Sequence, residues 1–253
     1  MRKRMLSILC VLALCLGLLP VTALADGPDS SITNIPAGLE IEGTVVTDYE
    51  GTATVVDIPE GVTEIGSYAF LNSTVQEVTL PSTLTTIGEY AFAQSALTSI
   101  TIPDSVTTIE AFAFTKTKSL IHATILGNPT LGNNAFSESG IKSIEMDQVT
   151  AISYLCFASS SLSSISMKSV KVIEDSAFQY TNFTEFALPD SVEATGSFIL
   201  LGAELTQLTL SLQTLLQGQI DSKTFNNAFY NLSPYANNTD HPDRCGSGHN
   251  PAG

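Results

Sequence analysis

Few side chains in this 253-residue sequence have the types and spacing that chemistry requires. Ser99, His122 and Ser143 follow one another at intervals of about 22 residues, and Glu145 lies two residues after Ser143. A serine hydroxyl, an imidazole and a carboxylate can together form an activated nucleophile. Such a nucleophile also needs a pocket, oxyanion donors and the exclusion of water. Residues this far apart meet only if the chain folds as a regular repeat. Whether they can form a nucleophile therefore depends on the elements that position them.

A second group of candidate ligands lies near the C-terminus. His241, Cys245 and His249 are four residues apart and could hold a metal ion. A structural zinc site takes four ligands, however, and only three are present here. The sequence has neither a paired-cysteine motif nor a glycine-rich phosphate loop. We therefore expect no metal site and no cofactor.

The first 25 residues have the three parts of a secretory signal peptide. Residues 2–4 are basic, residues 5–19 are almost wholly apolar, and residues 23–25 read Ala-Leu-Ala. The apolar run of ~15 residues is shorter than the about 20 that a membrane-spanning helix needs. The pattern predicts export with cleavage after Ala25. No later apolar stretch is long enough to predict a membrane span.

Cysteine content and charge narrow the class of the exported protein. Cleavage would remove Cys10 and Cys15, and the remaining Cys156 and Cys245 are too few and too far apart for a disulfide scaffold. The sequence holds 25 acidic and 10 basic residues, and residues 26–115 contain no Lys or Arg. This acidic excess argues against nucleic acid as a partner. It favours solubility, and it leaves loose association with divalent cations open.

An internal repeat dominates the sequence. A phenylalanine returns every 21 or 22 residues, at Phe70, Phe92, Phe114, Phe136, Phe157 and Phe178. A seventh copy has Leu200 in its place. The preceding residue is alanine, except for Cys156, which we expect to be a buried, unreactive thiol. Each unit also has three spaced apolar residues, such as Leu97, Ile100 and Ile102, which alternate with polar residues as in a half-buried strand.

A unit of about 22 residues cannot bury its own apolar face, so neighbouring units must stack on it and share one core. The phenylalanines would then stack from turn to turn, and the small residue beside each would allow close approach. A first, weaker copy of the strand consists of Ala53, Val56 and Ile58. Four glycines of the repeat suit a tight bend: Gly66, Gly88, Gly132 and Gly196.

The unit L-x-x-I-x-I-P-x-x-V-x-x-I-G-x-x-A-F resembles the BspA-like leucine-rich repeats of secreted and surface-attached bacterial proteins. The resemblance covers residues 53 to about 210. It implies a mainly β protein, a right-handed solenoid of about 7–8 turns with a parallel sheet on one face. It also implies surface attachment or binding, and no enzymatic activity.

Changes in composition divide the chain into four segments. Residues 1–25 are the signal peptide, and residues 26–52 are a cap segment expected to form a short hairpin or an extended strand. Residues 53–231 are the solenoid, whose last unit is degenerate and cap-like. Residues 232–253 are rich in Pro, Gly and Asn, which predicts a flexible tail or linker.

The residues between the buried positions of each predicted strand point outwards and form two rows along the solenoid. Eight strands would give one sheet about 35 Å wide, large enough for a macromolecular partner. The rows are rich in hydroxyls and contain no aromatic residue, which does not favour a tight sugar site on this face. A solvated polar face is also the default for a one-sided sheet. The candidate binding residues are Thr79, Ser99, Thr101, His122, Thr124, Ser143 and Glu145.

Three aromatic residues form a second stripe, one place before the repeated alanine: Tyr68, Tyr90 and Phe112. They could make a lateral stacking surface. More commonly, a stripe at the repeat period belongs to the core or packs between turns.

The leading functional hypothesis is a secreted or cell-surface protein that binds another macromolecule as an adhesin does, without catalysis. Its partner would be a protein or glycoprotein, such as host matrix, mucin or another surface protein, and we expect a monomer. The alternative is a rigid spacer module with no tight ligand of its own. A hydrolase built on His122 is a third possibility, but an open sheet offers neither a pocket nor oxyanion donors.

Overall fold

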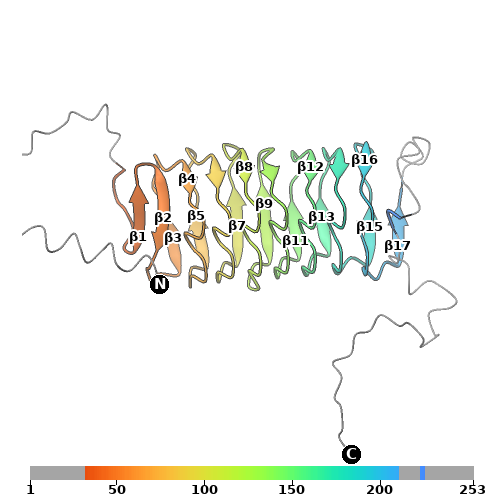
Figure 1. Ribbon diagram of the computed structural model, residues 1–253, viewed down its shortest axis with the longest axis horizontal. Helices are drawn as coiled ribbons and strands as arrows, with labels where there is room; N and C mark the ends of the chain where they lie inside the picture. The colour runs from red at the N-terminus through yellow and green to blue at the C-terminus, as the bar shows by residue number, and fades with distance from the viewer. Residues whose placement is uncertain (1–31, 211–222, 226–253) are drawn as a thin grey trace, which may run out of the picture. The chain divides into compact units, whose positions relative to one another are not determined.

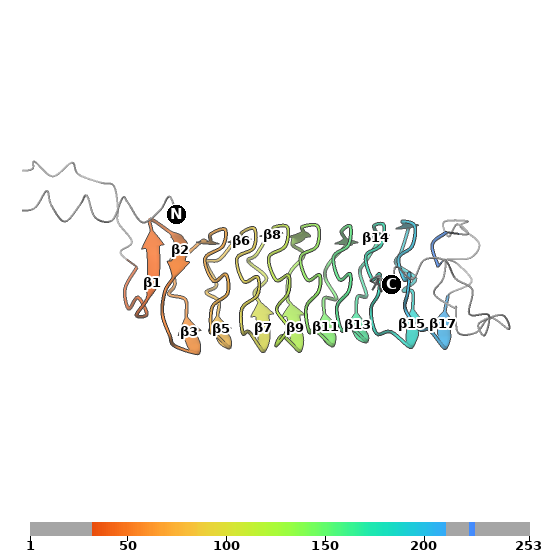
Figure 2. The same ribbon diagram turned by 60° about the horizontal axis from the view of Figure 1, so that its bottom comes forward.

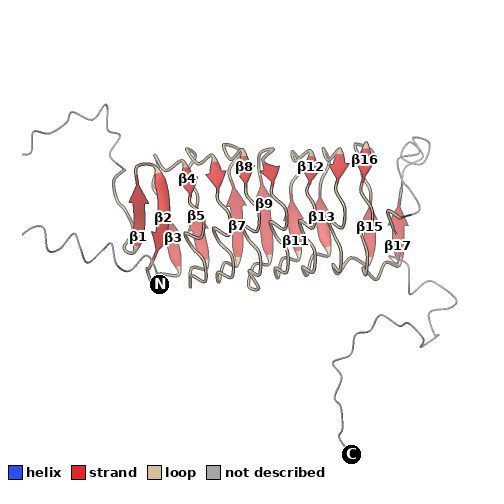
Figure 3. Cartoon of the chain, viewed as in Figure 1, coloured by secondary structure: helices blue, strands red, loops and turns tan. Residues whose placement is uncertain are grey.

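The computed structural model describes residues 32–210 and 223–225. The predicted signal peptide, the predicted tail and its candidate metal ligands His241, Cys245 and His249 lie outside these residues. The described chain consists of strands and turns and contains no helix (Figure 3). Accordingly, no helix within residues 32–210 and 223–225 is long and apolar enough to cross a bilayer.

Each turn of the solenoid contributes one strand to each of two faces (Figure 1). The first face consists of β3 (Val55–Asp57), β5 (Glu77–Thr79), β7 (Ser99–Ile102), β9 (His122–Ile125), β11 (Ser143–Glu145), β13 (Ser164–Ser166), β15 (Glu185–Ala187) and β17 (Gln207–Thr209). The second face consists of two-residue strands, β4 (Glu64–Ile65), β6 (Thr86–Ile87), β8 (Thr108–Ile109), β10 (Thr130–Leu131), β12 (Ala151–Ile152), β14 (Val172–Ile173) and β16 (Ala194–Thr195). Figure 2 shows the two faces as separate rows of strands.

Strands of one face pair in parallel, and each residue pairs with its equivalent in the next turn. For example, β9 aligns His122 with Ser99 on β7 and with Ser143 on β11. This register follows from the repeat, because a slip by one residue would turn the apolar side chains to solvent. The solenoid fold predicted from the sequence is confirmed, and the second parallel face adds to the single face that was expected.

A β-hairpin lies against the first turn. Strands β1 (Leu39–Glu42) and β2 (Val45–Tyr49) pair antiparallel, and β2 then pairs in parallel with β4. The hairpin therefore covers an edge of the second face that would otherwise expose unpaired backbone groups. Tyr49 also extends the aromatic core, because its ring centroid lies 5.1 Å from that of Phe70.

A ladder of phenylalanine rings forms the centre of the core, as the spacing predicted. The six phenylalanines from Phe70 to Phe178 are fully buried, and successive ring centroids lie 4.9 to 5.6 Å apart. The small residues beside them, including Cys156, are buried as well. Leu200 continues the buried column, whereas Ala53 of the first copy is exposed, contrary to the prediction. The last ring, Phe178, instead meets Phe183 edge-on at 5.8 Å.

The first face is not one sheet of eight strands, so the prediction of a single sheet about 35 Å wide is wrong. Strands β7, β9, β11 and β13 form one sheet, while β3–β5 and β15–β17 are separate pairs. The backbone of Thr98 still donates to Gln76 where β7 approaches β5, but the two strands do not pair. The second face is also interrupted, between β10 and β12.

A third side of each turn joins the second face to the first; we call it the bend side (residues 66–73 in one turn and their equivalents). The four glycines predicted at tight bends stand directly before the turns of this side, but none of them has a positive φ: Gly66, Gly88, Gly132 and Gly196. These glycines serve close approach: a Cβ on Gly132 would lie 2.3 Å from the backbone nitrogen of Ala111. The left-handed residues are non-glycines two places before and two places after the core phenylalanine, such as Tyr68 and Asn72.

Residues 223–225 continue the bend side after the last complete turn. The backbone of Phe198 donates to Lys223, and that of Ile199 donates to Thr224, which is buried. The hydroxyls of Thr195 and Thr224 lie 3.3 Å apart. Residues 223–225 therefore accept backbone hydrogen bonds from the last complete turn, as each turn does from the turn before it.

Candidate binding surface

All seven candidate binding residues lie on the first face, on strands β5 to β11. Parallel pairing places Thr101, Thr124 and Glu145 side by side in one row, and Ser99, His122 and Ser143 in the other. Their side chains are exposed or half-buried, as the alternation predicted, because the intervening residues fill the core. Thr79 lies on β5, across the break from the four-stranded sheet. The role of these residues in binding stays a prediction.

His122 is held by two neighbouring hydroxyls. Its Nδ1 lies 2.9 Å from the Oγ of Ser143 on the next strand, and its Nε2 lies 3.2 Å from the Oγ1 of Thr124 on its own strand. One ring nitrogen of a neutral imidazole donates and the other accepts, and a hydroxyl can serve either role. The ring is half-buried and fixed between the two rows.

A hydrolytic triad is not assembled. Ser143 and His122 are within hydrogen-bonding distance, but Thr124 occupies the position that the acid of a triad would need. Glu145 is instead paired across the sheet with Thr124. A neutral hydroxyl cannot stabilise the imidazolium that forms when histidine accepts the serine proton. The cluster is therefore a polar network on an open sheet.

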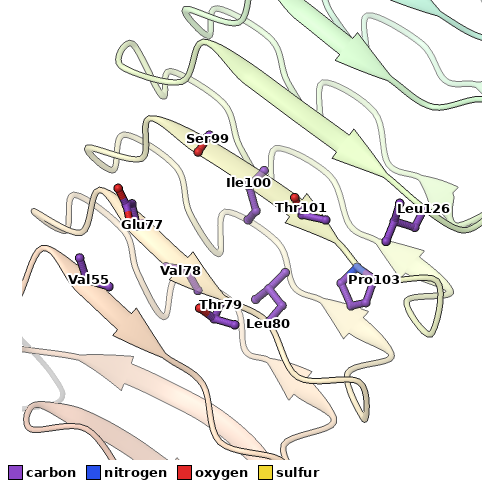
Figure 4. Close-up of a pocket in the computed structure, with 10 residues that line it drawn as sticks. All are labelled: Val55, Glu77, Val78, Thr79, Leu80, Ser99, Ile100, Thr101, Pro103 and Leu126. Carbon is purple, nitrogen blue, oxygen red and sulfur yellow. The ribbon is translucent and has the colours of Figure 1, made fainter.

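A hollow of about 400 Å³ lies at the break between β5 and β7 (Figure 4). Its rim carries outward residues of both strands, including Glu77, Thr79, Ser99 and Thr101, while apolar side chains form the rest of its lining. A second hollow, of about 320 Å³, lies at the break between β13 and β15. The breaks in the sheet thus expose apolar surface on a face that is otherwise polar.

Three ion pairs join adjacent turns of the described solenoid. Lys171 lies 3.0 Å from Glu193, and the ammonium of Lys168 contacts the carboxylate of Asp147. Hydrogen bonds from Lys168 and from Ser166 lower the pKa of Asp147, because they favour the charged carboxylate. Within the described residues, no group of three or more His, Cys, Asp and Glu side chains is placed to hold a metal ion.

Cys156 occupies the place of the repeated alanine, and its side chain is fully buried. Burial raises the pKa of its thiol to about 12, since desolvation disfavours the thiolate. The thiolate is the reactive form of cysteine. The predicted role as a core residue is therefore supported by the structure.

The aromatic stripe lies on the bend side and packs from turn to turn. Ring centroids of Tyr68 and Tyr90 are 5.2 Å apart, and those of Tyr90 and Phe112 are 4.8 Å apart, with nearly parallel planes. Tyr68 is 50% exposed, so the stripe is a surface stack rather than part of the core. The sequence left two interpretations of this stripe open, packing between turns and a lateral surface. The structure shows that the rings do both.

A second column runs along the bend side, two residues after each core phenylalanine, and was not predicted from the sequence. It consists of left-handed residues, namely Asn72, Gln94, Lys116, Glu138, Ser159 and Tyr180, and ends at Gly202. Together with the aromatic column it borders a hollow of about 330 Å³. The constant offset of two residues from each phenylalanine could have revealed this column in the sequence. The residue types in it share no property that would have predicted a left-handed conformation.

Two stacked parallel faces with a repeated apolar core define the class of this protein as a leucine-rich-repeat solenoid. The sequence profile of the BspA type leucine-rich repeat region matches residues 49–162 and 150–238, with six copies. The chain therefore belongs to the BspA type leucine-rich repeat family.

Solved structures show the same fold. A leucine-rich repeat protein from Bacteroides ovatus is 28% identical, with a TM-score of 0.51; the match covers 62% of this chain and 44% of that protein. A leucine-rich repeat protein from Eubacterium ventriosum is 21% identical, with a TM-score of 0.58, and the match covers 68% and 50%. This chain thus spans half or less of their length. No curated protein matches the sequence.

Proposed function

We propose that this protein is exported and binds a protein or glycoprotein through the first face of its solenoid, without catalysis, as an adhesin does. The observation that carries the proposal is the four-stranded sheet β7–β13, where parallel register brings Thr101, Thr124 and Glu145 into one outward row. Each turn repeats the presentation, so a large partner can make many polar contacts at once.

The same face carries the features of a macromolecular interface. Such interfaces combine an apolar centre with a polar rim. The hollow between β5 and β7 supplies apolar side chains such as Val78 and Leu80, and the two rows supply hydroxyls around it. The hydrogen bond between His122 and Thr124 already orders both side chains, which lowers the entropy lost on binding.

Export is part of the proposal and rests on the signal-like N-terminus. Mass spectrometry of protein recovered outside the cell should find Asp26 as the N-terminal residue. Recovery of extracellular protein that still begins at Met1 would contradict cleavage after Ala25.

A spacer role is the second candidate. The continuous ladder of buried phenylalanines and the turn-to-turn hydrogen bonds make the solenoid suited to hold another module at a fixed distance. In that case the first face would bind nothing tightly. Pull-down of matrix and mucin components with the purified protein separates the two, since a spacer would retain none of them.

The binding face is tested by a triple charge variant, Thr101→Lys, Thr124→Lys and Glu145→Lys. These outward positions leave the core intact, so binding to the component found in the pull-down should be lost while the thermal midpoint changes little. A control with the same change in net charge is Ser67→Lys, Glu89→Lys and Asn133→Lys on the bend side. If only the control variant lost binding, the interface would lie on the bend side and the proposal for the first face would be wrong.

A further inference from the structure

The hollow at the break between β5 and β7 has two ends of different character (Figure 4). Glu77 and Ser99 lie at one end, and Leu80, Pro103 and Leu126 lie at the other. The hollow therefore runs along the two strands, from a charged and polar end to an apolar end. Its volume of about 400 Å³ leaves room for side chains of a partner.

The apolar end is open to solvent. Leu126 is 51% exposed, and Leu80 and Pro103 are half-buried. Removing such apolar surface from water is favourable. A partner that places an apolar side chain on these three residues therefore gains binding free energy from burial.

The break also leaves a backbone donor without an acceptor. In other turns the residue that follows the strand donates its N–H to the next turn, as Ile58 does to Thr79 and Met146 does to Ser166. Leu80 holds the equivalent position, and its N–H has no acceptor within residues 32–210 and 223–225. A carbonyl group of a bound peptide can accept this hydrogen bond.

The charged end is anionic and has no cation to balance it. Glu77 is exposed on β5, and parallel register places Val55 of β3 directly beside it. Residues 32–115 include no Lys or Arg, and none of the three ion pairs of the described solenoid involves Glu77. The exposed carboxylates of Asp57 and Asp104, on the turns of β3 and β7, add to the negative charge. Charge complementarity therefore favours a cationic partner.

The distance between the two ends suits a short extended segment. Side chains two residues apart point to the same side of an extended chain and lie roughly 7 Å apart. Glu77 and Thr79 have this relation on β5, and Leu80 follows directly. A segment that runs along the strands can therefore place a basic side chain at Glu77 and an apolar side chain at the other end. The aliphatic stem of the basic side chain would lie on Val55.

We propose that this hollow binds an extended segment of a partner protein in which a lysine or arginine and an apolar residue are two positions apart. The cationic group pairs with Glu77, and the apolar side chain packs on Leu80, Pro103 and Leu126. This inference rests on the proposed function, because it names the chemistry of the partner that the first face recognises.

The test measures the fluorescence anisotropy of labelled peptides mixed with the purified protein. The probe peptide repeats the unit Thr-Arg-Thr-Leu, and two control peptides replace either its arginines by glutamate or its leucines by serine. The probe should bind, the glutamate peptide should not, and the serine peptide should bind about tenfold more weakly. A higher salt concentration should weaken binding of the probe, because the charged end is exposed.

Two variants of the hollow have matched controls elsewhere on the solenoid. Glu77→Gln removes the anionic end, and its control is Glu64→Gln on β4 of the second face. Leu126→Ser removes an exposed apolar side chain, and its control, Ile121→Ser, removes one of similar exposure at the other end of β9. The two hollow variants should each weaken binding of the probe by about tenfold, and the two controls should leave it unchanged. All four side chains are exposed or half-buried, so a thermal melt should find every variant folded.

Four outcomes overturn the hollow as a site. The probe does not bind at millimolar concentration, the glutamate peptide binds as tightly as the probe, the hollow variants bind the probe as the unchanged protein does, or the controls lose as much binding as the hollow variants. The last outcome would mean that the peptide binds to the acidic surface at large.

The proposed function fails or stands separately. The component recovered in the pull-down could be lost by the triple lysine variant of the first face and still be retained by Glu77→Gln and Leu126→Ser. In that case the first face binds its partner, and the inference about the hollow is wrong.

Discussion

The ring of Phe114 stacks on the ring of Phe136 with centroids 4.9 Å apart and planes 6° from parallel. Both rings are fully buried, and the same contact recurs between the other turns. Adjacent strands of a sheet lie about 4.8 Å apart, so the ring spacing follows the spacing of the turns. Each phenylalanine therefore stabilises two neighbours at once.

Replacing Phe114 by alanine should lower the free energy of unfolding by about 3–5 kcal/mol. The loss combines removal of a fully buried ring with a cavity that the stacked neighbours cannot fill. Urea denaturation followed by circular dichroism measures it. Thr101→Ala on the exposed row is the control and should have little effect. Equal stability of both variants would mean that the ladder does not hold the turns together.

Replacing Gly132 by alanine should destabilise the protein by about 1–3 kcal/mol through overpacking. Its Cβ would lie 2.3 Å from the nitrogen of Ala111, a backbone atom that cannot rotate away. Gly43→Ala is a suitable control, because nothing lies within 4 Å of a Cβ there. That control has only the penalty of its positive φ, roughly 1–2 kcal/mol. A larger effect at Gly43 would contradict the role assigned to Gly132.

Asp147 should contribute to stability in a pH-dependent way. Its pKa is lowered in the folded state, mainly by Lys168, so its contribution is present above the ordinary value of 3.8 and is lost as the pH falls below it. Lys168 is largely exposed and Asp147 partly so, and solvent screening therefore keeps the effect small. Between about pH 5 and about pH 3, Asp147→Asn should lose less stability than the unchanged protein. Parallel losses in urea denaturation would contradict this.

Cys156 should resist modification until the protein unfolds. Because burial raises the pKa of its thiol to about 12, almost no thiolate exists at neutral or mildly alkaline pH. Peptide mass spectrometry after treatment with iodoacetamide should find Cys156 unlabelled in the native protein and labelled in urea. The variant Cys156→Ala restores the residue of the other turns and should keep the stability nearly unchanged. Rapid labelling of the native protein would show that the turn opens.

Several features of this protein could be predicted from the sequence because each turn contacts only its neighbours. The period of the phenylalanines becomes the period of the core, and the alternation around Ile100 and Ile102 assigns Ser99 and Thr101 to the outer side. The family, the solenoid, the ring ladder and the outward position of the candidate binding residues all followed from this local pattern. Its physical basis is that stacked turns of the same shape bury the same apolar positions in each turn.

The tertiary structure decided the features that depend on distances of a few ångströms between turns. Whether β5 pairs with β7, whether His122 meets Thr124 or Glu145, and whether Gly132 serves a bend or a close approach cannot be read from periodicity. The hollow between Phe112 and Tyr180 likewise arises from two columns that the sequence separates and the turns bring together. Hydrogen bonding and steric contact are short-ranged, so such relationships exist only once the turns are stacked.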